Sequence, residues 1–214
     1  MSLVDKYDLE DFFEGKNVSE HNQNIMRNYL KSIERDGWSK ATVKNNLDIM
    51  KFLVSHIHTD LDKLTEDDVD DYCDAVNDWC RKNGKPVSDV TKKQYKVGLS
   101  RFLRKYGEKT KNKSLIELSK FNMGRAGLKS KLPEDILTVE EVDRMIEAAG
   151  SIRDKALISL MYESGARRGE IEKCRLKDIK PHPHGFHIML NGKTGARQIL
   201  LIRCQTFLRE WLNY

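Results

Sequence analysis

Hydrophobic residues recur at helical spacing through the first half of the chain, and this pattern predicts four helices. The apolar stripes lie within 20–35, 40–57, 66–83 and 90–107. Residues that favour helix N-caps precede these stripes: Ser19, Ser39, Thr65, and either Ser88 or Asp89. Gly84 is expected to end the third helix. The pattern therefore predicts a helical domain at 19–107, preceded by an N-terminal segment at 1–18.

The periodicity weakens after this domain and changes towards the end of the chain. Residues 108–131 are rich in Lys and interrupted by Gly, which predicts a basic linker with one short helical turn. Order resumes at 132–214, where Thr138-x-x-Glu141 forms a capping box. The elements expected there are helices at 139–148, 152–162 and 168–174, strands at 185–190 and 197–202, and a last helix. A Gly-Lys-Thr-Gly turn joins the two strands. We expect a mainly α protein whose second domain is α+β.

Charged residues are distributed unevenly along the chain. The net charge is only +5, but 59–78 holds nine acids and one Lys, whereas 85–131 holds fourteen bases and three acids. A basic block in a chain of nearly balanced charge is typical of a protein that binds a polyanion. A solvated, Lys-rich surface is the alternative. Nucleic acid is therefore the partner that the charge pattern favours.

Other features restrict the class of protein. No apolar run approaches the roughly 18 residues of a membrane span, and the N-terminus does not resemble a signal peptide. The four Cys form no C-x-x-C pair, so we expect free thiols, a cytoplasmic location and no membrane partner. His182, His184 and His187 lie among Pro and Gly, which favours a turn. We therefore expect neither a metal site nor a cofactor.

Arg167 and Arg168 are the candidate phosphate-binding residues. They follow Gly165 at the expected start of a short helix, and Glu170 comes one turn later. An Arg side chain presents a planar fork of N–H donors that can hold two phosphate oxygens. From the residues alone, an ordinary surface Arg pair is the alternative, and Lys193 could equally be an ordinary residue of a hairpin turn.

The order of these motifs resembles the catalytic domain of the tyrosine recombinase family (phage integrase, Xer-like). The family's Thr/Ser-Gly-x-Arg-x-x-Glu-Leu motif matches 164–171, so the resemblance selects Arg167 as the phosphate-binding Arg and Glu170 as its support. Lys193 matches the hairpin Lys that the family uses as general acid for the leaving 5′ oxygen. The helical first half resembles, more weakly, the family's four-helix, SAM-like core-binding domain, which clamps DNA. The resemblance covers nearly the whole chain and is strongest at 132–200.

The sequence departs from the family after Lys193. The resemblance implies site-specific recombination, with strand cleavage and rejoining through a phosphotyrosine in the complete protein. The family's His/Lys-x-x-Arg motif, its further His or Trp and its nucleophilic Tyr lie farther from the Arg167 position than the 47 residues that follow it here. Tyr214 directly follows the hairpin and a helix, so we expect no catalytic role for it. We expect a catalytic domain truncated at its C-terminus, and a chain that binds DNA without cleaving it; whether it is an enzyme as it stands is left open.

The resemblance also implies which residues contact DNA, because two helices of the core-binding domain approach the major groove in the family. The expected DNA-binding residues are Lys40, Thr42, Lys44, Lys92, Lys93, Lys96, Arg101 and Arg104. We expect Lys92, Lys93 and Lys96 to share one helix face. The expected partners are double-stranded DNA and full-length recombinase protomers bound to it. The alternative function is a non-catalytic DNA-binding protein or regulator derived from a recombinase, and the basic block disfavours a helical module without a DNA role.

Overall fold

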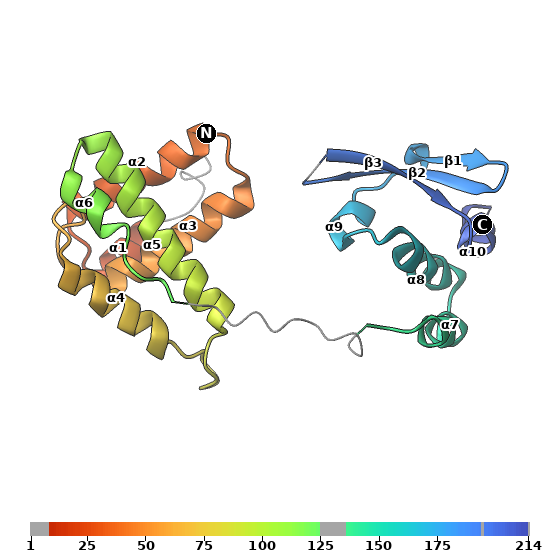
Figure 1. The fold of residues 1–214 in the computed structure, drawn as a ribbon, viewed down its shortest axis with the longest axis horizontal. Helices are drawn as coiled ribbons and strands as arrows, with labels where there is room; N and C mark the ends of the chain where they lie inside the picture. Colours follow the sequence, from red (N-terminus) through yellow and green to blue (C-terminus); the bar gives the residue numbers. More distant parts are fainter. Residues whose placement is uncertain (1–8, 125–135, 194, 214) are drawn as a thin grey trace. The chain divides into compact units, whose positions relative to one another are not determined.

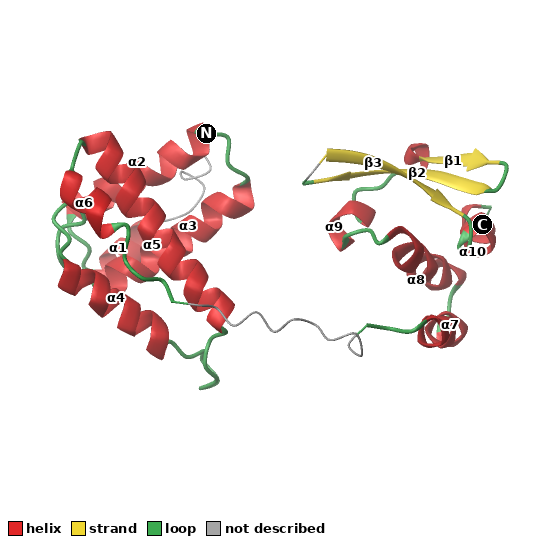
Figure 2. Cartoon of the chain, viewed as in Figure 1, coloured by secondary structure: helices red, strands yellow, loops and turns green. Residues whose placement is uncertain are grey.

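The computed structural model describes residues 9–124, 136–193 and 195–213. The chain divides into two compact units, Met1–Lys129 and Ser130–Tyr214, each with its own hydrophobic core (Figure 1). Helices predominate, and the strands that the structure describes belong to the second unit (Figure 2). Within these ranges, no helix combines the length and the apolar character needed to cross a bilayer. The fold is therefore mainly α with a small antiparallel sheet, as the sequence pattern predicted.

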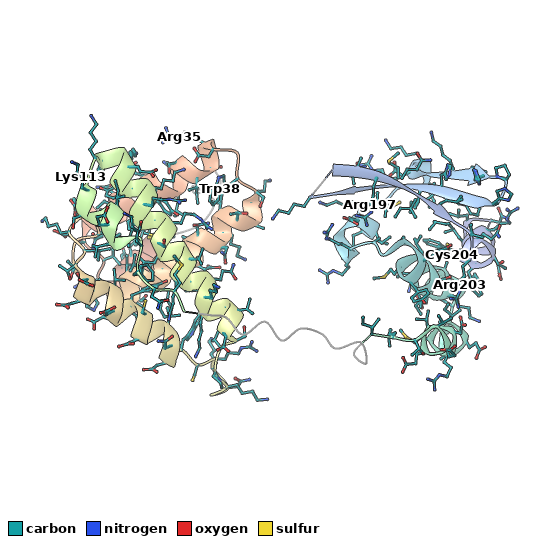
Figure 3. The ribbon with its side chains drawn as sticks, viewed as in Figure 1. Arg35, Trp38, Lys113, Arg197, Arg203 and Cys204 are labelled. Atoms are coloured by element: carbon teal, nitrogen blue, oxygen red, sulfur yellow. The ribbon has the colours of Figure 1, made fainter. Side chains whose placement is uncertain are left out.

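The described part of the first unit folds into helices, four of which begin at capping residues that the sequence identifies. The helices are α1 (Glu10–Lys16), α2 (Glu20–Arg35), α3 (Lys40–His56), α4 (Glu66–Asp78), α5 (Asp89–Thr110) and α6 (Lys113–Leu118). The side chains of Ser19, Ser39, Thr65 and Ser88 each accept the backbone N–H three residues later, so Ser88 and not Asp89 caps α5. Trp38, labelled in Figure 3, packs against the core just before α3 begins.

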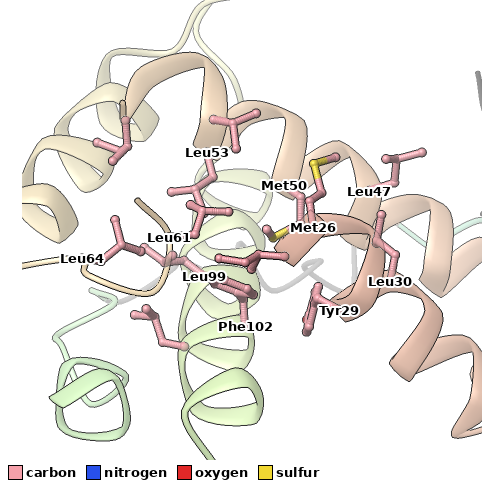
Figure 4. Packing of buried hydrophobic residues seen from close by; sticks show 14 of the residues in the cluster. Met26, Tyr29, Leu30, Leu47, Met50, Leu53, Leu61, Leu64, Leu99 and Phe102 are labelled. Atoms are coloured by element: carbon pink, nitrogen blue, oxygen red, sulfur yellow. The ribbon is translucent and has the colours of Figure 1, made fainter. Parts of the chain in front are cut away.

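The core of the first unit lies between α2, α3 and α5. Figure 4 shows Met26 of α2, Met50 of α3 and Phe102 of α5 packed together, and each is almost fully buried. Gly98 lets α3 and α5 approach closely, because a Cβ at this position would lie 2.4 Å from Cδ1 of Ile49. This contact fixes the spacing of the two helices that carry the expected DNA-binding residues.

The sequence pattern does not predict α1, and it places the end of α4 incorrectly. α1 has seven residues, too few for a periodic pattern, yet it buries Leu9 and Phe13 in the core. α4 ends at Asp78 and does not continue to Gly84. The backbone becomes extended after Asp78. Cys80 then forms an antiparallel bridge with the segment before α5, and this pairing takes the place of further helical hydrogen bonds.

Much of the expected linker, 108–131, is folded against the first unit instead. α5 continues to Thr110, and Asn112 caps α6 by accepting the backbone N–H of Leu115 at 3.3 Å. Leu115 is buried in the core of the first unit. The apolar residues that anchor this segment are few, so its Lys residues hide the helical period from a pattern analysis. The bases Arg125, Lys129 and Lys131 lie outside the described residues.

The second unit packs helices against a three-stranded sheet. Its elements are α7 (Val139–Ala148), α8 (Ile152–Ser164), α9 (Arg168–Ile171), the 3-10 helix η3 (Leu176–Asp178), β1 (Ile179–His182), β2 (Gly185–Gly192), β3 (Gly195–Leu201) and α10 (Gln205–Leu212). The strands are antiparallel in the order β1-β2-β3. The sequence pattern predicts β2 and β3 but not β1. Pro181 weakens the strand signal there, although a Pro is tolerated on an edge strand.

One face of the sheet forms the core of the second unit. Phe186, Ile188 and Leu190 alternate along β2 and are buried, whereas the residues between them are more exposed. They pack with Leu160 of α8 and Leu208 of α10. The loop that leads from α8 into α9 is therefore held close to this inner face, where α9 contacts β2.

Candidate functional site

Arg167 lies in a tight turn between α8 and α9. Gly165 ends α8 in the left-handed conformation, with φ 55°, and its N–H donates to the carbonyl oxygen of Met161 at 3.1 Å. The hydroxyl of Ser164 accepts the N–H of Ala166 at 3.2 Å and donates to the carbonyl four residues earlier at 2.6 Å. These bonds define the turn and make Arg167 the N-cap residue of α9.

Glu170 anchors Arg167 from within the fold. Only 3% of its side chain is exposed, and it is the one buried charged residue in the part of the chain that the structure describes. Oε2 accepts the backbone N–H of Arg167 at 3.1 Å, and Oε1 accepts a bond from Nη1 of Arg167 at 3.0 Å. The Arg167 side chain is itself 63% exposed. One edge of the guanidinium is therefore held, while the rest faces solvent and is able to bind an anion.

The structure adds a second arginine to this site, Arg197, which the sequence analysis does not single out. Arg197 pairs with Leu190 across the sheet, so its side chain leaves β3 on the inner face, towards α9 (Figure 3). Its Nη2 donates to Oε2 of Glu170 at 2.8 Å, and its Nη1 donates to Oε1 at 3.4 Å. A signal for this role exists in the sequence. Arg197 alternates with Ile199 and Leu201, and a charge on the apolar face of a strand requires a partner.

The β2–β3 hairpin reaches Glu170 through Gly192. A Cβ at Gly192 would lie 2.1 Å from Oε1 of Glu170, so a larger residue does not fit without displacing the carboxylate. Lys193 follows in the turn with an exposed side chain, and Thr194 lies outside the described residues. Glu170 thus contacts both the Arg167 turn and the base of the hairpin that carries Lys193. No hydrogen bond or ion pair in the described ranges joins Lys193 directly to Arg167.

The surroundings of Glu170 keep it ionised. Its pKa is lowered by the hydrogen bond from the backbone N–H of Arg167, against the opposing effect of burial, and further by the guanidinium groups of Arg167 and Arg197. A carboxylate between two guanidinium groups leaves a net charge of +1. The site therefore keeps a positive charge to offer to a phosphate.

The Lys residues near the start of α5 differ in whether they have a partner within the fold. Lys96 donates to Oδ1 of Asn77 at 2.9 Å, and Lys92 donates to the backbone carbonyl of Asn77, so both lie against the end of α4. Lys93 is rotated by about 100° from Lys92 on the helix and is exposed. The three Lys residues therefore differ in their contacts, since Lys92 and Lys96 bond to Asn77 whereas Lys93 is exposed.

Arg101 joins the middle of α5 to the start of α3. Its guanidinium lies over the ring of Trp38, 5.0 Å from the centroid. Trp38 directly precedes Ser39, whose hydroxyl bonds to the hydroxyl of Thr42 at 2.8 Å. Arg101 and Thr42 are therefore placed near the same helix start, but each has a partner within the fold.

Four of the expected DNA-binding residues remain open to solvent. Lys40 and Lys44 lie one turn apart on α3, and Lys93 and Arg104 lie on the outer side of α5. All four are exposed, and no side-chain hydrogen bond or ion pair engages them in the described part of the chain. These four cations are thus exposed members of the set that the sequence predicts to bind DNA.

The His residues of the β1–β2 turn form a ring cluster. The rings of His182 and His187 lie 4.5 Å apart, and the pKa of His182 is lowered by burial and by its two His neighbours. A different group, His21, Asp60 and Asp62, brings its ligand atoms within metal-binding distance of one another in the described ranges. Its members are exposed or half-buried, and His21 already bonds to Asp62. An exposed group of this kind is common without a metal, so it does not change the expectation.

Known proteins share both sequence and fold with this chain. It is 33% identical over 150 residues to the tyrosine recombinase XerD of Bifidobacterium longum, covering 58% of this chain and 47% of the relative. It is 28% identical over 155 residues to XerD of Mycobacterium tuberculosis, covering 66% of this chain and 47% of that protein. The chain thus spans about half the length of these curated relatives. No family model matches it.

Solved structures show the same architecture. One is the XerH site-specific recombinase bound to a palindromic difH substrate in a post-cleavage complex, with a TM-score of 0.57, 19% identity, and coverage of 82% of this chain and 53% of that chain. Another is XerH bound to difH before cleavage, with a TM-score of 0.54, 18% identity, and coverage of 95% and 66%. At this level of identity, the likeness shows the fold.

The helical unit followed by a unit with a small antiparallel sheet is the fold that the chain shares with these XerH structures. Over the part of those proteins that it spans, the chain is therefore similar in sequence to the XerD tyrosine recombinases and similar in fold to the XerH recombinase.

Proposed function

We propose that this chain binds double-stranded DNA as part of a site-specific tyrosine recombinase, and that Arg167 binds the phosphate at which such a protein acts. The observation that carries the proposal is the anchored Arg167, whose guanidinium is held on one edge by buried Glu170 and is otherwise exposed. An Arg fixed in this way needs little reordering when it binds two phosphate oxygens. Its relatives XerD are tyrosine recombinases, and XerH binds its difH substrate.

The role proposed for Lys193 follows from its place beside this site. Glu170 contacts Gly192, the residue directly before Lys193. A Lys on an exposed turn next to a bound phosphate is able to donate a proton to the leaving 5′ oxygen. Lys193 is therefore proposed as the general acid of the complete reaction, which proceeds through a phosphotyrosine.

The 214-residue chain itself is proposed to bind DNA without cleaving it. Arg167 and Lys193 are present, but phosphoryl transfer also needs a nucleophile and a second clamp on the phosphate oxygens. We match no residue of this sequence to the family's nucleophilic Tyr or to its His/Lys-x-x-Arg motif. Incubation with a nicked duplex that traps covalent intermediates tests this. No adduct is expected, and a protein–DNA adduct would overturn this part of the proposal.

The first unit is proposed to supply most of the binding to DNA through the open cations on α3 and α5. These cations would contact phosphates and not bases. The affinity would therefore depend on the salt concentration, and the sequence specificity would be low. We also propose a cytoplasmic location and further recombinase protomers on the same DNA as partners.

Two matched double variants test the DNA-binding face in a salt-titrated duplex-binding assay. Lys93→Ala/Arg104→Ala removes two open cations and is expected to weaken binding and to reduce the salt slope by up to about 2. Lys92→Ala/Lys96→Ala removes the same charge from side chains that bond to Asn77, so a smaller change of slope is expected. Equal effects of the two variants would contradict the assignment of the face. Absence of duplex binding even at low salt would overturn the proposed function.

A further inference from the structure

Glu170 receives two guanidinium groups, and they reach it from different elements. Arg167 comes from the start of α9 and gives one side-chain hydrogen bond, at 3.0 Å. Arg197 comes from β3 and spans both carboxylate oxygens, at 2.8 and 3.4 Å. The Arg167 side chain is 63% exposed, whereas that of Arg197 is 38% exposed. The two arginines are therefore not equivalent: Arg197 is bound into the fold, and Arg167 is presented to solvent.

The charge of the site depends on Arg197. Glu170 and Arg167 without it would form a neutral pair, and the carboxylate would have both oxygens available to Arg167. A guanidinium that meets a free carboxylate tends to bind it through two parallel bonds. That arrangement would turn the donors of Arg167 inward and cancel the charge that attracts a phosphate. By occupying the carboxylate with two bonds, Arg197 leaves Arg167 with a single inward bond and a net charge of +1 at the site.

Arg197 also connects the hairpin to Arg167. It lies on β3 near the turn, and Gly192 on the paired strand fits against the same carboxylate oxygen that both arginines contact. The turn that carries Lys193 is thus tied to Glu170 from both of its strands. A shift of the hairpin would move Glu170, and a shift of Glu170 would move the guanidinium of Arg167.

We propose that Arg197 is a positioning residue for phosphate binding: it neutralises and orients Glu170, so that Arg167 points outward and stays charged towards the DNA. This inference rests on the proposed function, because it concerns the same phosphate site. Arg197 itself is not proposed to touch the DNA.

A double-mutant cycle on the full 214-residue chain tests this role. The variants are Arg167→Ala, Arg197→Met and the double substitution, each titrated with one duplex at several salt concentrations. Arg197→Met is expected to weaken duplex binding by about fivefold, the factor that corresponds to a coupling of about 1 kcal/mol. In the Arg167→Ala background, the same substitution is expected to have almost no further effect, because the residue that it positions is gone.

Two further variants, together with melting curves, distinguish the positioning role of Arg197 from an effect of its charge alone and from a loss of folding. Arg197→Lys keeps the charge but loses the fork, so it is expected to recover only part of the affinity. Arg153→Met removes an exposed Arg of the same unit, which pairs with Asp154, and is expected to leave affinity nearly unchanged. Melting curves of all variants set a common assay temperature at which each is folded, and Arg197→Lys serves as the probe if Arg197→Met does not fold.

The outcomes are distinct. If Arg197→Met weakens binding equally with and without Arg167, Arg197 contacts DNA independently and the positioning role is wrong. A lowered melting temperature with unchanged affinity would reduce Arg197 to a structural residue and also overturn the inference. If the chain binds duplex but Arg167→Ala has no effect, the proposed phosphate site fails, and the inference fails with it.

Discussion

At the residue scale, the site is organised around one buried carboxylate. Glu170 satisfies its two oxygens with the backbone and side chain of Arg167 and with the fork of Arg197. A buried charge is tolerated when partners of this kind surround it, and it becomes costly when one of them is removed. Changes at Glu170 or at its immediate neighbours are therefore expected to affect both folding and DNA binding.

Gly192→Ala tests the close approach of the hairpin to Glu170. The new Cβ would lie 2.1 Å from Oε1, so either the carboxylate or the strand must move. We expect the substitution to destabilise the chain by about 1–3 kcal/mol, which is the usual range for overpacking. Gly169→Ala is the matched control, because a Cβ at Gly169 meets no atom within 4 Å. Denaturant unfolding of both variants checks this, and equal stabilities would count against the contact.

Glu170→Gln tests the electrostatics of the site through pH. The pKa of Glu170 is lowered in the folded chain, so its ionised form stabilises the fold above the unfolded pKa of about 4.3. This contribution is lost as the pH falls through the folded pKa. The difference in free energy of unfolding between wild type and Glu170→Gln should therefore shrink as the pH falls below about 4.3. Other acids with lowered pKa values are common to both proteins and cancel in the difference. A difference that stays constant between pH 7 and pH 3 would contradict this account of the site.

The sequence predicts part of this residue-scale picture. Their order after Gly165 makes Arg167, Arg168 and Glu170 candidates, because the chemistry of an Arg near a carboxylate is local, and the resemblance to the tyrosine recombinases selects Arg167. Arg197 does not emerge, because its partner lies 27 residues away, on another element. The alternation of side chains along β3 does place Arg197 on the apolar face of the strand. Only the pairing of β2 with β3 and the docking of α9 show that this face leads to Glu170.

At the element scale, a second carboxylate fixes the end of the sheet. Glu163 of α8 accepts the backbone N–H groups of Ile202, Arg203 and Cys204, at 2.6, 2.8 and 2.8 Å. These groups precede α10, so Glu163 ties α8, β3 and α10 together across about forty residues of sequence. Burial alone would raise the pKa of Glu163, but the three backbone hydrogen bonds lower it overall.

Glu163→Gln is expected to loosen this junction. An amide has one oxygen, and its NH₂ group would face a backbone donor, so at least one N–H loses its acceptor. The expected loss is about 2–3 kcal/mol, since hydrogen bonds to a charged group are involved. Glu172→Gln, at an exposed pair with Arg168, should cost less than about 1 kcal/mol. Chemical denaturation separates the two cases, and similar losses would mean that Glu163 does not hold the junction.

The elements that the sequence predicts are those with long periodic patterns or clear caps. α2, α3, α5 and α7 begin where Ser or Thr caps them. The short elements α1 and β1 are missed, and α6 is expected only as one short helical turn, for physical reasons. α1 and α6 have too few turns to show a period, and β1 contains Pro181 and is paired on one side only. Each of these elements is stabilised by tertiary contacts, which a local pattern does not contain.

At the scale of the whole molecule, some basic side chains contact partners within the fold, whereas others are exposed to solvent. Lys92, Lys96 and Arg101 are engaged within the first unit, whereas Lys93 and Arg104 are open on the outer side of α5. In the second unit, Arg167 is presented to solvent from an anchored position. The composition predicts a polyanion partner, but only the structure shows which cations are free to meet it.

Duplex binding by Arg167→Ala and Arg168→Ala, side by side, tests the central claim most directly. The two variants remove the same charge from neighbouring positions, but Arg167 is anchored by Glu170, whereas Arg168 is 86% exposed and pairs with Glu172. Arg167→Ala is expected to weaken binding about tenfold or more, as for the loss of a charged hydrogen bond to phosphate. Arg168→Ala is expected to weaken it about twofold or less. Equal losses, or a larger loss for Arg168→Ala, would contradict the claim that Glu170 and Arg197 present Arg167 to the phosphate.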